Sequence, residues 1–236
     1  MSVDSPHAHQ ALLLTGRWFA GLPAPLRAGL LSAAVVRALP SGQRLFSRGD
    51  APCGLYCVLE GSIRASGVDE RGREALLMLV EPPNWFGEIS LFDGQPRTHD
   101  AVAEGPTRVL QVPQPALLTL LAAEPRYWRE LALLMCHKLR LAFVALEELS
   151  LLGAPARVAR RLVLMAEGYG ELSAGQRQVL AVSQEQLALM LSLSRQTTNQ
   201  LLKELEGRGL VQLSYGHIEL LDLPGLRAAA SSPRAP

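Results

Sequence analysis

The sequence predicts an α+β protein with an N-terminal β-roll, jelly-roll-like in its strand arrangement, followed by a long dimerisation helix and a C-terminal winged helix-turn-helix. Three observations support this order. Short apolar segments separated by glycine turns occupy residues 43–112. Residues 125–152 contain no glycine, and their one proline stands at the start, where a helix tolerates it. Residues 182–211 carry the pattern of two short helices joined by a brief turn.

Changes in composition divide the chain into five parts. Gly153-Ala154-Pro155 is typical of a hinge, and the alanine-, serine- and proline-rich end is typical of a disordered tail. The predicted parts are an N-terminal tail with a short helix (1–22), the β-roll (23–124), the dimerisation helix (125–152), the winged helix-turn-helix (153–226) and a disordered tail (227–236).

The composition indicates a soluble globular protein. Of the 236 residues, 48% are hydrophobic and 19% are charged, and the net charge is +1. Any basic surface for nucleic acid must therefore be local. No apolar run is long enough for a membrane span, and three cysteines cannot all pair, so we expect a cytoplasmic protein. No nucleophile–base pair, metal motif or phosphate-binding loop of the P-loop type is present, so we do not expect an enzyme.

Residues 1–10 are polar and expected to be mobile, and helices are then expected over residues 11–20 and 25–38, before Pro40 and Gly42. Strand signals follow, with a glycine turn every eight to twelve residues or so, as in an antiparallel sandwich or barrel. The expected strands are 43–47, 54–60, 62–66, 74–80, 101–103 and 108–112.

The helix expected over residues 125–152 has two apolar faces. One is a seam at steps of three and four residues, formed by Ala132, Met135, Leu139, Ala142, Leu146 and Leu149. Leu131, Leu134, Leu141 and Val144 form the other. We expect one face to pack on its own domain and the seam to pack on a second copy of the chain. An ordinary helix buried within one domain would show the same periodicity.

Residues 84–101 combine groups that suit a sugar phosphate. Gly87 permits close approach of the backbone to a ligand, and the free N–H groups of the short helix expected after it can face an anion. Glu88 offers an acceptor for a sugar hydroxyl. Arg97 offers a planar donor fork for a phosphate, and Thr98 adds a hydroxyl. Each of these residues could instead be a solvated surface residue.

The stretch Phe86-Gly87-Glu88-Ile89-Ser90-Leu91, followed by Arg97-Thr98, resembles the phosphate-binding cassette of cyclic-nucleotide-binding domains. That cassette reads Gly-Glu-Leu/Ile-small-Leu, then Arg-Ser/Thr-Ala. The resemblance implies that Glu88 contacts the ribose 2′-hydroxyl, that Arg97 and Thr98 contact the cyclic phosphate, and that Gly87 gives a backbone donor. The predicted ligand-binding set also includes Ile89 and Ser90. His99 stands where the family usually has alanine.

Residues 182–221 predict a winged helix-turn-helix. Ser183 and Gln186 have the spacing of a capping box, and Ser194 is placed to cap a second helix after a tight connection. A small hairpin around Tyr215-Gly216 would form the wing. The outer face of the second helix is rich in groups that can read base edges, where arginine pairs with guanine and amides with adenine. The predicted DNA-binding residues are Ser194, Arg195, Gln196, Thr197, Asn199 and Gln200.

This segment resembles the DNA-binding domain of the Crp–Fnr regulators, whose recognition helix begins Ser/Thr-Arg-Glu-Thr-Val-Ser/Gly-Arg. Gln196 replaces the family's glutamate and Gln200 its second arginine. With the cassette, the long helix and the winged helix in family order, the resemblance covers roughly residues 19–226. It implies a homodimer that binds a palindromic double-stranded operator, with RNA polymerase as a partner.

The effector is left open by the sequence. In cyclic-AMP-responsive members of the family, hydroxyl residues on the long helix meet the adenine, and the matching positions here are Ala142 and Phe143. Alanine cannot donate a hydrogen bond, and phenylalanine could only stack. The effector could be cyclic AMP bound loosely, cyclic GMP or cyclic di-GMP, or the regulator could need no ligand. An alternative is a ligand-binding module whose degenerate DNA domain acts through protein partners.

No metal or haem is expected. Cys53 and Cys57 lie four apart and would share one side of a strand, which a metal or redox pair would need, but we favour buried structural cysteines. The iron–sulfur branch of the family uses an N-terminal cysteine cluster that this chain lacks. His99, His137 and Cys136 have no supporting motif and are interpreted as structural.

Overall fold

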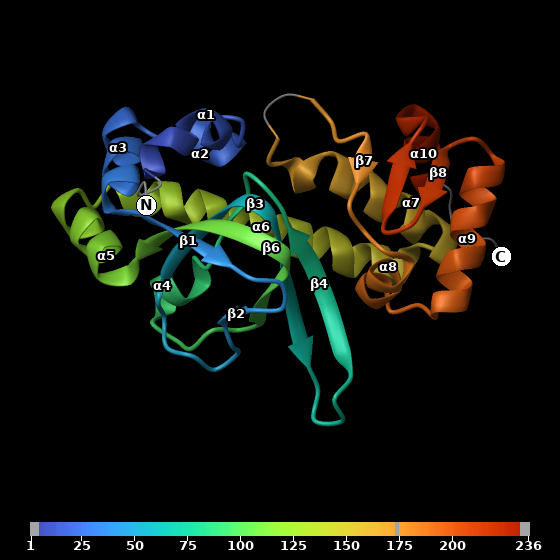
Figure 1. Cartoon of the computed structure of the whole chain (residues 1–236), viewed down its shortest axis with the longest axis horizontal. Helices are drawn as coiled ribbons and strands as arrows, with labels where there is room; N and C mark the ends of the chain where they lie inside the picture. Colours follow the sequence, from blue (N-terminus) through green and yellow to red (C-terminus); the bar gives the residue numbers. More distant parts are fainter. Residues whose placement is uncertain (1–4, 173–174, 232–236) are drawn as a thin grey trace. The chain divides into compact units, whose positions relative to one another are not determined.

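The computed structural model describes residues 5–172 and 175–231, which divide into two compact units (Figure 1). The first consists of residues up to Gly72 together with Leu77–Lys138, and the second of Arg73–Leu76 together with the chain from Leu139 onward. An antiparallel sheet domain, a long helix and a C-terminal helical domain follow one another, which confirms the predicted fold class.

The first unit begins with four short helical segments. They are η1 (Pro6–His9), α1 (Gln10–Leu13), α2 (Arg17–Gly21) and α3 (Ala24–Ala33). The start of the chain is thus helical from Pro6 on, where a mobile segment was expected. The helix expected over residues 25–38 ends early, because β-branched Val35 and Val36 pair with a strand instead.

The sheet has six strands: β1 (Val35–Leu39), β2 (Arg44–Phe46), β3 (Gly54–Val68), β4 (Glu74–Val80), β5 (Trp85–Phe86) and β6 (Asp100–Pro113). The path is β1-β6-β3-β4, with β2 paired to β6 and β5 to β3. Two strands were expected in place of β3 and two in place of β6. They are continuous because the β3–β6 ladder absorbs Gly61 as a register shift between Glu60 and Ser62.

Side-chain alternation along β3 separates two cores. Leu55, Cys57 and Leu59 belong to a cluster with residues of the N-terminal helices, and Tyr56 and Val58 belong to a second cluster on the other face. Cys53 precedes the strand and packs against the second cluster. The expectation that Cys53 and Cys57 share one side is therefore wrong, because the strand begins only at Gly54.

Helix α4 (Ile89–Asp93) lies within the cassette, between β5 and β6, and α5 (Gln114–Ala123) and α6 (Tyr127–Leu151) follow β6. In its first half α6 buries Leu131 and Leu134 in the cluster that contains residues of the N-terminal helices, and Trp18 Nε1 donates to the Glu130 carbonyl at 2.7 Å. Later along α6 the large apolar side chains are exposed: Leu139 by 52%, Phe143 by 61%, Leu146 by 60% and Leu149 by 54%.

The second unit is mainly helical. Its elements after α6 are α7 (Ala154–Ala166), η2 (Gly168–Gly170), β7 (Val179–Leu180), α8 (Gln184–Leu191), α9 (Arg195–Gly207), β8 (Val211–Ser214), β9 (His217–Leu220) and α10 (Leu223–Ala230). The three strands form a sheet in the order β7-β9-β8.

Helix α10 corrects the prediction of a disordered tail from residue 227. Asp222 caps this helix through the Gly225 N–H, and Leu226 is fully buried. Arg227 pairs with Glu167 at 2.8 Å. The capping and the buried leucine hold the chain in a helix through Ala230, and the rest of the predicted tail, from residue 232, lies outside the described residues. In the described part of the chain no helix is both long enough and apolar enough to cross a membrane.

Candidate functional site

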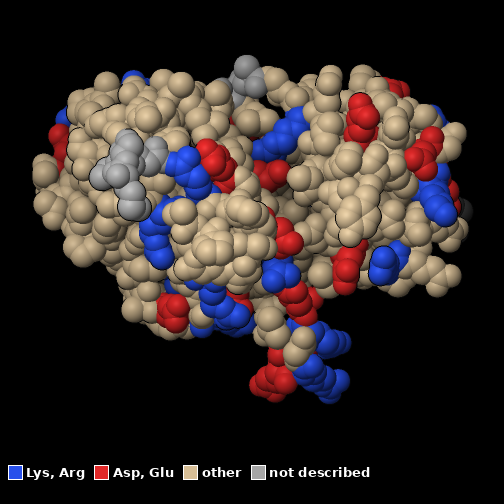
Figure 2. Space-filling view, in the orientation of Figure 1, with Lys and Arg blue, Asp and Glu red and all other residues tan. Residues whose placement is uncertain are grey.

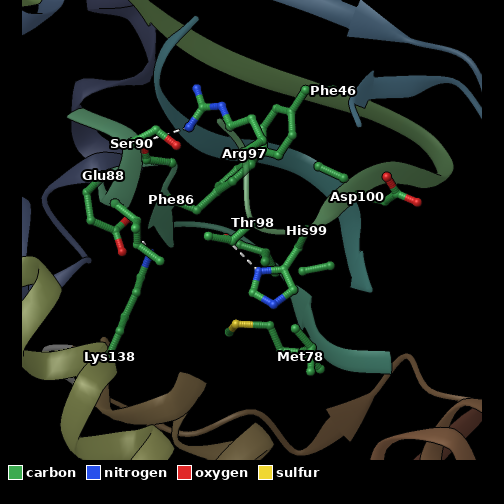
Figure 3. A pocket seen from close by; sticks show the side chains of 16 residues that line it. Phe46, Met78, Phe86, Glu88, Ser90, Arg97, Thr98, His99, Asp100 and Lys138 are labelled. Atoms are coloured by element: carbon green, nitrogen blue, oxygen red, sulfur yellow. Dashed lines mark hydrogen bonds and ion pairs between the residues drawn. The ribbon is translucent and has the colours of Figure 1, made fainter. Parts of the chain in front are cut away.

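The cassette residues surround a cavity of about 200 Å³ in the first unit (Figure 3). Strands β2 to β6, the short helix α4 and the first half of α6 all contribute to its wall. The lining residues are Phe46, Ala65, Leu77, Met78, Val80, Phe86, Gly87, Glu88, Ile89, Ser90, Arg97, Thr98, His99, Asp100, Ala101 and Lys138. Six of the eight predicted ligand-binding residues are therefore brought together at one cavity.

Gly87 is required by its surroundings as well as by its backbone. Its φ is +96°, in the region that favours glycine. A Cβ atom placed there would lie 3.0 Å from Arg97 Nη1 and 3.0 Å from the Gly54 carbonyl oxygen. Any larger residue would push the Arg97 guanidinium away from this part of the cassette.

Arg97 is held by the protein itself. Its side chain is only 4% exposed, and Nη1 donates to the Gly87 carbonyl at 2.8 Å while Nη2 donates to the Gly54 carbonyl at 2.7 Å. Nη2 also lies 3.2 Å from Cys53 Sγ, and the guanidinium carbon sits 4.5 Å from the centre of the Phe46 ring. The residue expected to bind phosphate thus also ties β3 to the cassette.

A hydrogen-bonded chain continues from Cys53 to β6. Tyr56 Oη donates to Cys53 Sγ at 3.0 Å and accepts from Gln111 Nε2 at 3.1 Å. Burial, followed by the bond to Cys53, raises the pKa of Tyr56, so its hydroxyl keeps its proton and remains a donor. Cys53 is therefore contacted by Arg97 and Tyr56, a structural role.

Glu88 is 2% exposed, and its Oε2 lies 2.8 Å from Lys138 Nζ on α6 (Figure 3). The carboxylate is therefore balanced by a cation inside the pocket. The sequence prediction missed Lys138 because it considered ligand contacts on the long helix only at Ala142 and Phe143. Lys138 lies one helical turn before Ala142, a position that the resemblance had already linked to the ligand, and that spacing was the available signal.

The remaining predicted ligand residues differ in placement. Ser90 is 2% exposed, whereas Ile89 is 42% exposed at the cavity. Thr98 Oγ1 lies 2.8 Å from His99 Nδ1. Ala142 and Phe143 are exposed, belong to the second compact unit and are not among the lining residues.

The helix-turn-helix in the second unit begins with the predicted capping box. The Gln186 N–H donates to Ser183 Oγ at 3.2 Å, and the Ser183 N–H donates to Gln186 Oε1 at 2.8 Å, which confirms that prediction. Ser192 turns the chain in the left-handed conformation, at a φ of +53°. Ser194 then caps α9 by accepting from the Thr197 N–H at 3.0 Å. These contacts fix where α9 starts.

The predicted base-reading residues lie at the start of α9, but not all face outward. Arg195, Gln196, Thr197 and Gln200 are exposed. The Ser194 and Thr197 hydroxyls bond to each other at 2.8 Å, and Gln200 Nε2 donates to Glu204 at 3.2 Å. Asn199 is half-buried, and its Oδ1 has no hydrogen-bond partner within the part of the chain that the structure describes.

A groove of about 360 Å³ separates α8, Arg195 and the wing formed by β8 and β9. Its lining residues are Val182, Ser183, Gln184, Glu185, Arg195, Leu213, Ser214, Tyr215, Gly216 and Ile218. The Leu213 N–H donates to Glu206 of α9 at 2.8 Å, which ties the wing to the helix. Tyr215 is fully exposed at the turn. The sequence prediction included Arg195 and the wing but did not name Tyr215 as a candidate contact, because an exposed turn residue carries no periodic signal.

No cluster of three or more histidine, cysteine or acidic residues with metal-binding geometry occurs in residues 5–172 or 175–231. Among the cysteines, Cys57 is buried and Cys136 is exposed.

Comparison with protein families gives two matches in the order of the two units. Residues 36–124 match the model of the cyclic nucleotide-binding domain, and residues 156–229 match the model of the Crp-like helix-turn-helix domain.

Individual relatives match over most of their length. The cyclic AMP receptor protein of Thermus thermophilus is 33% identical over 78% of this chain and 82% of its own. A CRP-like cAMP-activated global transcriptional regulator of Mycobacterium tuberculosis is 29% identical over the same shares.

Among solved structures, a transcriptional regulator of the CRP/FNR family from Thermus thermophilus has a TM-score of 0.65 at 30% identity, over 84% of this chain and 98% of that one. The order of the domains, the cassette around its cavity and these matches lead to one conclusion. The chain belongs to the CRP/FNR family of transcription regulators, with a cyclic nucleotide-binding domain followed by a Crp-like helix-turn-helix.

Proposed function

We propose that the protein is a homodimeric, sequence-specific DNA-binding regulator whose N-terminal cavity binds a cyclic nucleotide. The observation that carries the effector part is the convergence of Gly87, Glu88, Arg97 and Thr98 on one cavity of about 200 Å³. A carboxylate for a sugar hydroxyl and donors for an anion are the groups that a ribose cyclic phosphate needs. We assign residues 23–124 to the nucleotide, residues 125–152 to the dimer and residues from 153 to the end of α10 to DNA, because α10 extends the last part beyond its predicted end at residue 226.

The dimer proposal rests on α6. Leu139, Leu146 and Leu149 of the seam are 52%, 60% and 54% exposed in the single chain. Leucines at heptad spacing on an exposed helical stripe favour a second copy of the same helix as their cover. The alternative of a helix buried within one domain does not account for three exposed seam leucines.

The DNA proposal rests on the start of α9. Arg195 lines the groove beside the wing, and Gln196 and Gln200 are exposed next to it. Charges of both signs are interspersed on the face shown in Figure 2. DNA recognition would therefore depend on the local surface at the start of α9 rather than on overall charge. Two copies would present their recognition helices to successive major grooves about 34 Å apart, which requires a palindromic operator. Such a regulator would act in the cytoplasm, with RNA polymerase as its partner.

The expectation for the nucleotide rests on the resemblance alone, because Ala142 and Phe143, the positions it matches to base contacts, are not among the residues that line the cavity. Ala142 has no hydrogen-bonding side chain, and Phe143 offers a ring face that stacks on any purine. A purine edge buried without partners costs about 1–3 kcal/mol, or roughly tenfold in affinity. Cyclic AMP is therefore the first nucleotide to test, since a relative carries its name, but weak discrimination between cyclic AMP and cyclic GMP is expected.

Two measurements test the proposal. Calorimetry with cyclic AMP, cyclic GMP and cyclic di-GMP should detect binding that weakens in Thr98→Ala, because Thr98 is an exposed residue that lines the cavity. Selection from random duplexes should return a palindrome whose half-site differs from that of relatives with glutamate and arginine in place of Gln196 and Gln200. Tight operator binding without any nucleotide binding would indicate a ligand-independent regulator. Weak binding to every duplex would indicate a module that acts through protein partners.

A further inference from the structure

His99 replaces the alanine of the cassette pattern and lines the cavity. Its Nδ1 lies 2.8 Å from Thr98 Oγ1, the hydroxyl expected to meet the phosphate, and the other ring nitrogen faces the side of the cavity where Met78 lies (Figure 3). The ring is half-buried. An ionisable group is thus hydrogen-bonded to a proposed ligand-binding residue.

The two other basic side chains of the cavity are already paired. Arg97 donates to the carbonyls of Gly87 and Gly54, and Lys138 pairs with Glu88. Only the His99 ring, among the basic groups that line this cavity, is bonded solely to a neutral hydroxyl in the structure as described. Its protonation would add a positive charge that no carboxylate contacts directly.

The charged groups that face His99 come from several elements. Arg48 lies in the turn after β2, and Asp100 begins β6, where its Oδ1 accepts from the Arg48 N–H at 2.8 Å and lies 3.5 Å from Arg44 Nη1. The ion pair of Glu88 with Lys138 stands across the cavity (Figure 3), and β4 contributes only Leu77, Met78 and Val80 to the lining. Burial, then Arg48, lowers the pKa of His99, and Asp100 opposes them.

We propose that protonation of His99 completes the phosphate-binding side of this cavity, so that the protein binds its cyclic nucleotide together with a proton. Counting donors gives the reason. In a neutral ring with its proton on Nε2, Nδ1 accepts a hydrogen bond from the Thr98 O–H, so Thr98 cannot donate to a phosphate. A neutral ring with its proton on Nδ1 frees Thr98 but remains uncharged. Only the imidazolium both leaves the Thr98 O–H free to donate and adds a positive charge.

The sign of the pH effect follows from linkage. A bound anion beside the ring favours the imidazolium, so the pKa of His99 is higher in the complex than in the free protein. Affinity is greatest below the free pKa, falls by up to about tenfold per pH unit between the two pKa values, and levels off above the pKa of the complex. Because burial and Arg48 lower the free pKa, the fall begins on the acidic side of the ordinary histidine range.

This inference rests on the proposed binding of a cyclic nucleotide. The test is calorimetry of the full chain with cyclic AMP and cyclic GMP from about pH 5.5 to about pH 8.5, in pairs of buffers with different heats of ionisation. The wild type should lose roughly tenfold or more in affinity across this range and take up close to one proton at intermediate pH. His99→Ala, which restores the family's residue, should bind with nearly constant affinity and no proton uptake.

His7→Ala, which removes an exposed histidine of η1, is the matched control and should keep the full pH dependence. If binding by the wild type does not weaken as pH rises, the inference about His99 is overturned and the proposed effector stands. The same holds if His99→Ala keeps the wild-type dependence of affinity on pH. An absence of binding to either nucleotide at every pH overturns the proposed effector, and the inference with it. Thermal unfolding of each variant shows that the comparison is made between folded proteins.

Discussion

Replacing Arg97 with alanine should destabilise the first unit even when no nucleotide is present. The change removes two hydrogen bonds, of 2.8 and 2.7 Å, to the Gly87 and Gly54 carbonyls and the contact with the Phe46 ring. Charge-assisted hydrogen bonds contribute about 1.5–3 kcal/mol each and a cation–π contact roughly 0.5–2 kcal/mol. Relief from burying a guanidinium offsets part of this sum, so we expect a net loss of about 2–4 kcal/mol in unfolding free energy.

Urea unfolding followed by tryptophan fluorescence suits this measurement, because every tryptophan lies in the first unit. The expected loss lowers the midpoint by about 1–2 M. Arg71→Ala, at the exposed tip of the β3–β4 hairpin, is the matched control and should change stability by less than about 0.5 kcal/mol. The midpoint of Arg97→Lys should lie between those of Arg97→Ala and Arg71→Ala, because an ammonium cannot form the planar fork. Equal midpoints for Arg97→Ala and Arg71→Ala would refute the structural role of Arg97.

Lys138→Ala leaves the buried Glu88 carboxylate without its partner. Because Lys138 is partly exposed, the same urea titration should show a loss of about 1–3 kcal/mol in unfolding free energy. An unchanged midpoint would mean that the pair does not form in solution. Leu146→Glu on the seam should give a monomer by light scattering, whereas Leu118→Glu, at an exposed leucine of α5, should leave the dimer intact; a monomeric wild type would contradict the seam. Arg195→Ala should weaken operator binding by about 1–3 kcal/mol and relax the preference at one base pair in a selection experiment, while a uniform loss across sequences would indicate a phosphate contact.

The sequence was most informative where local chemistry decides structure. Ser183 and Gln186 at capping-box spacing located the start of α8, and Ser194 located the start of α9. Glycine turns between short apolar runs predicted the antiparallel sheet domain. The sequence also predicted the order of cassette, glycine-free helix and helix-turn-helix, because each has its own periodicity or turn chemistry.

The sequence was less informative where residues distant in the chain decide the structure. Arg97 turns toward the Gly54 carbonyl, 43 residues earlier, and no local pattern gives that direction. The turn expected at Gly61 broke one strand in the sequence prediction, but pairing with β6 carries the strand through it. The helix expected over residues 25–38 was extended through Val35 and Val36, yet these β-branched residues pair with β6, a partner that lies more than 70 residues later in the chain.

The hydrogen bonds of Arg97 to two backbone carbonyls set up a competition with any phosphate that needs the same donors. If Arg97 is free of the two carbonyls in only a fraction of the molecules, the apparent affinity for the phosphate is reduced by that fraction. Release in about one molecule in a hundred would therefore weaken binding roughly a hundredfold. The reverse also holds, because a ligand that takes the arginine frees the Gly87 and Gly54 carbonyls. A ligand that competes for the arginine would therefore also loosen the tie between the cassette and the start of β3.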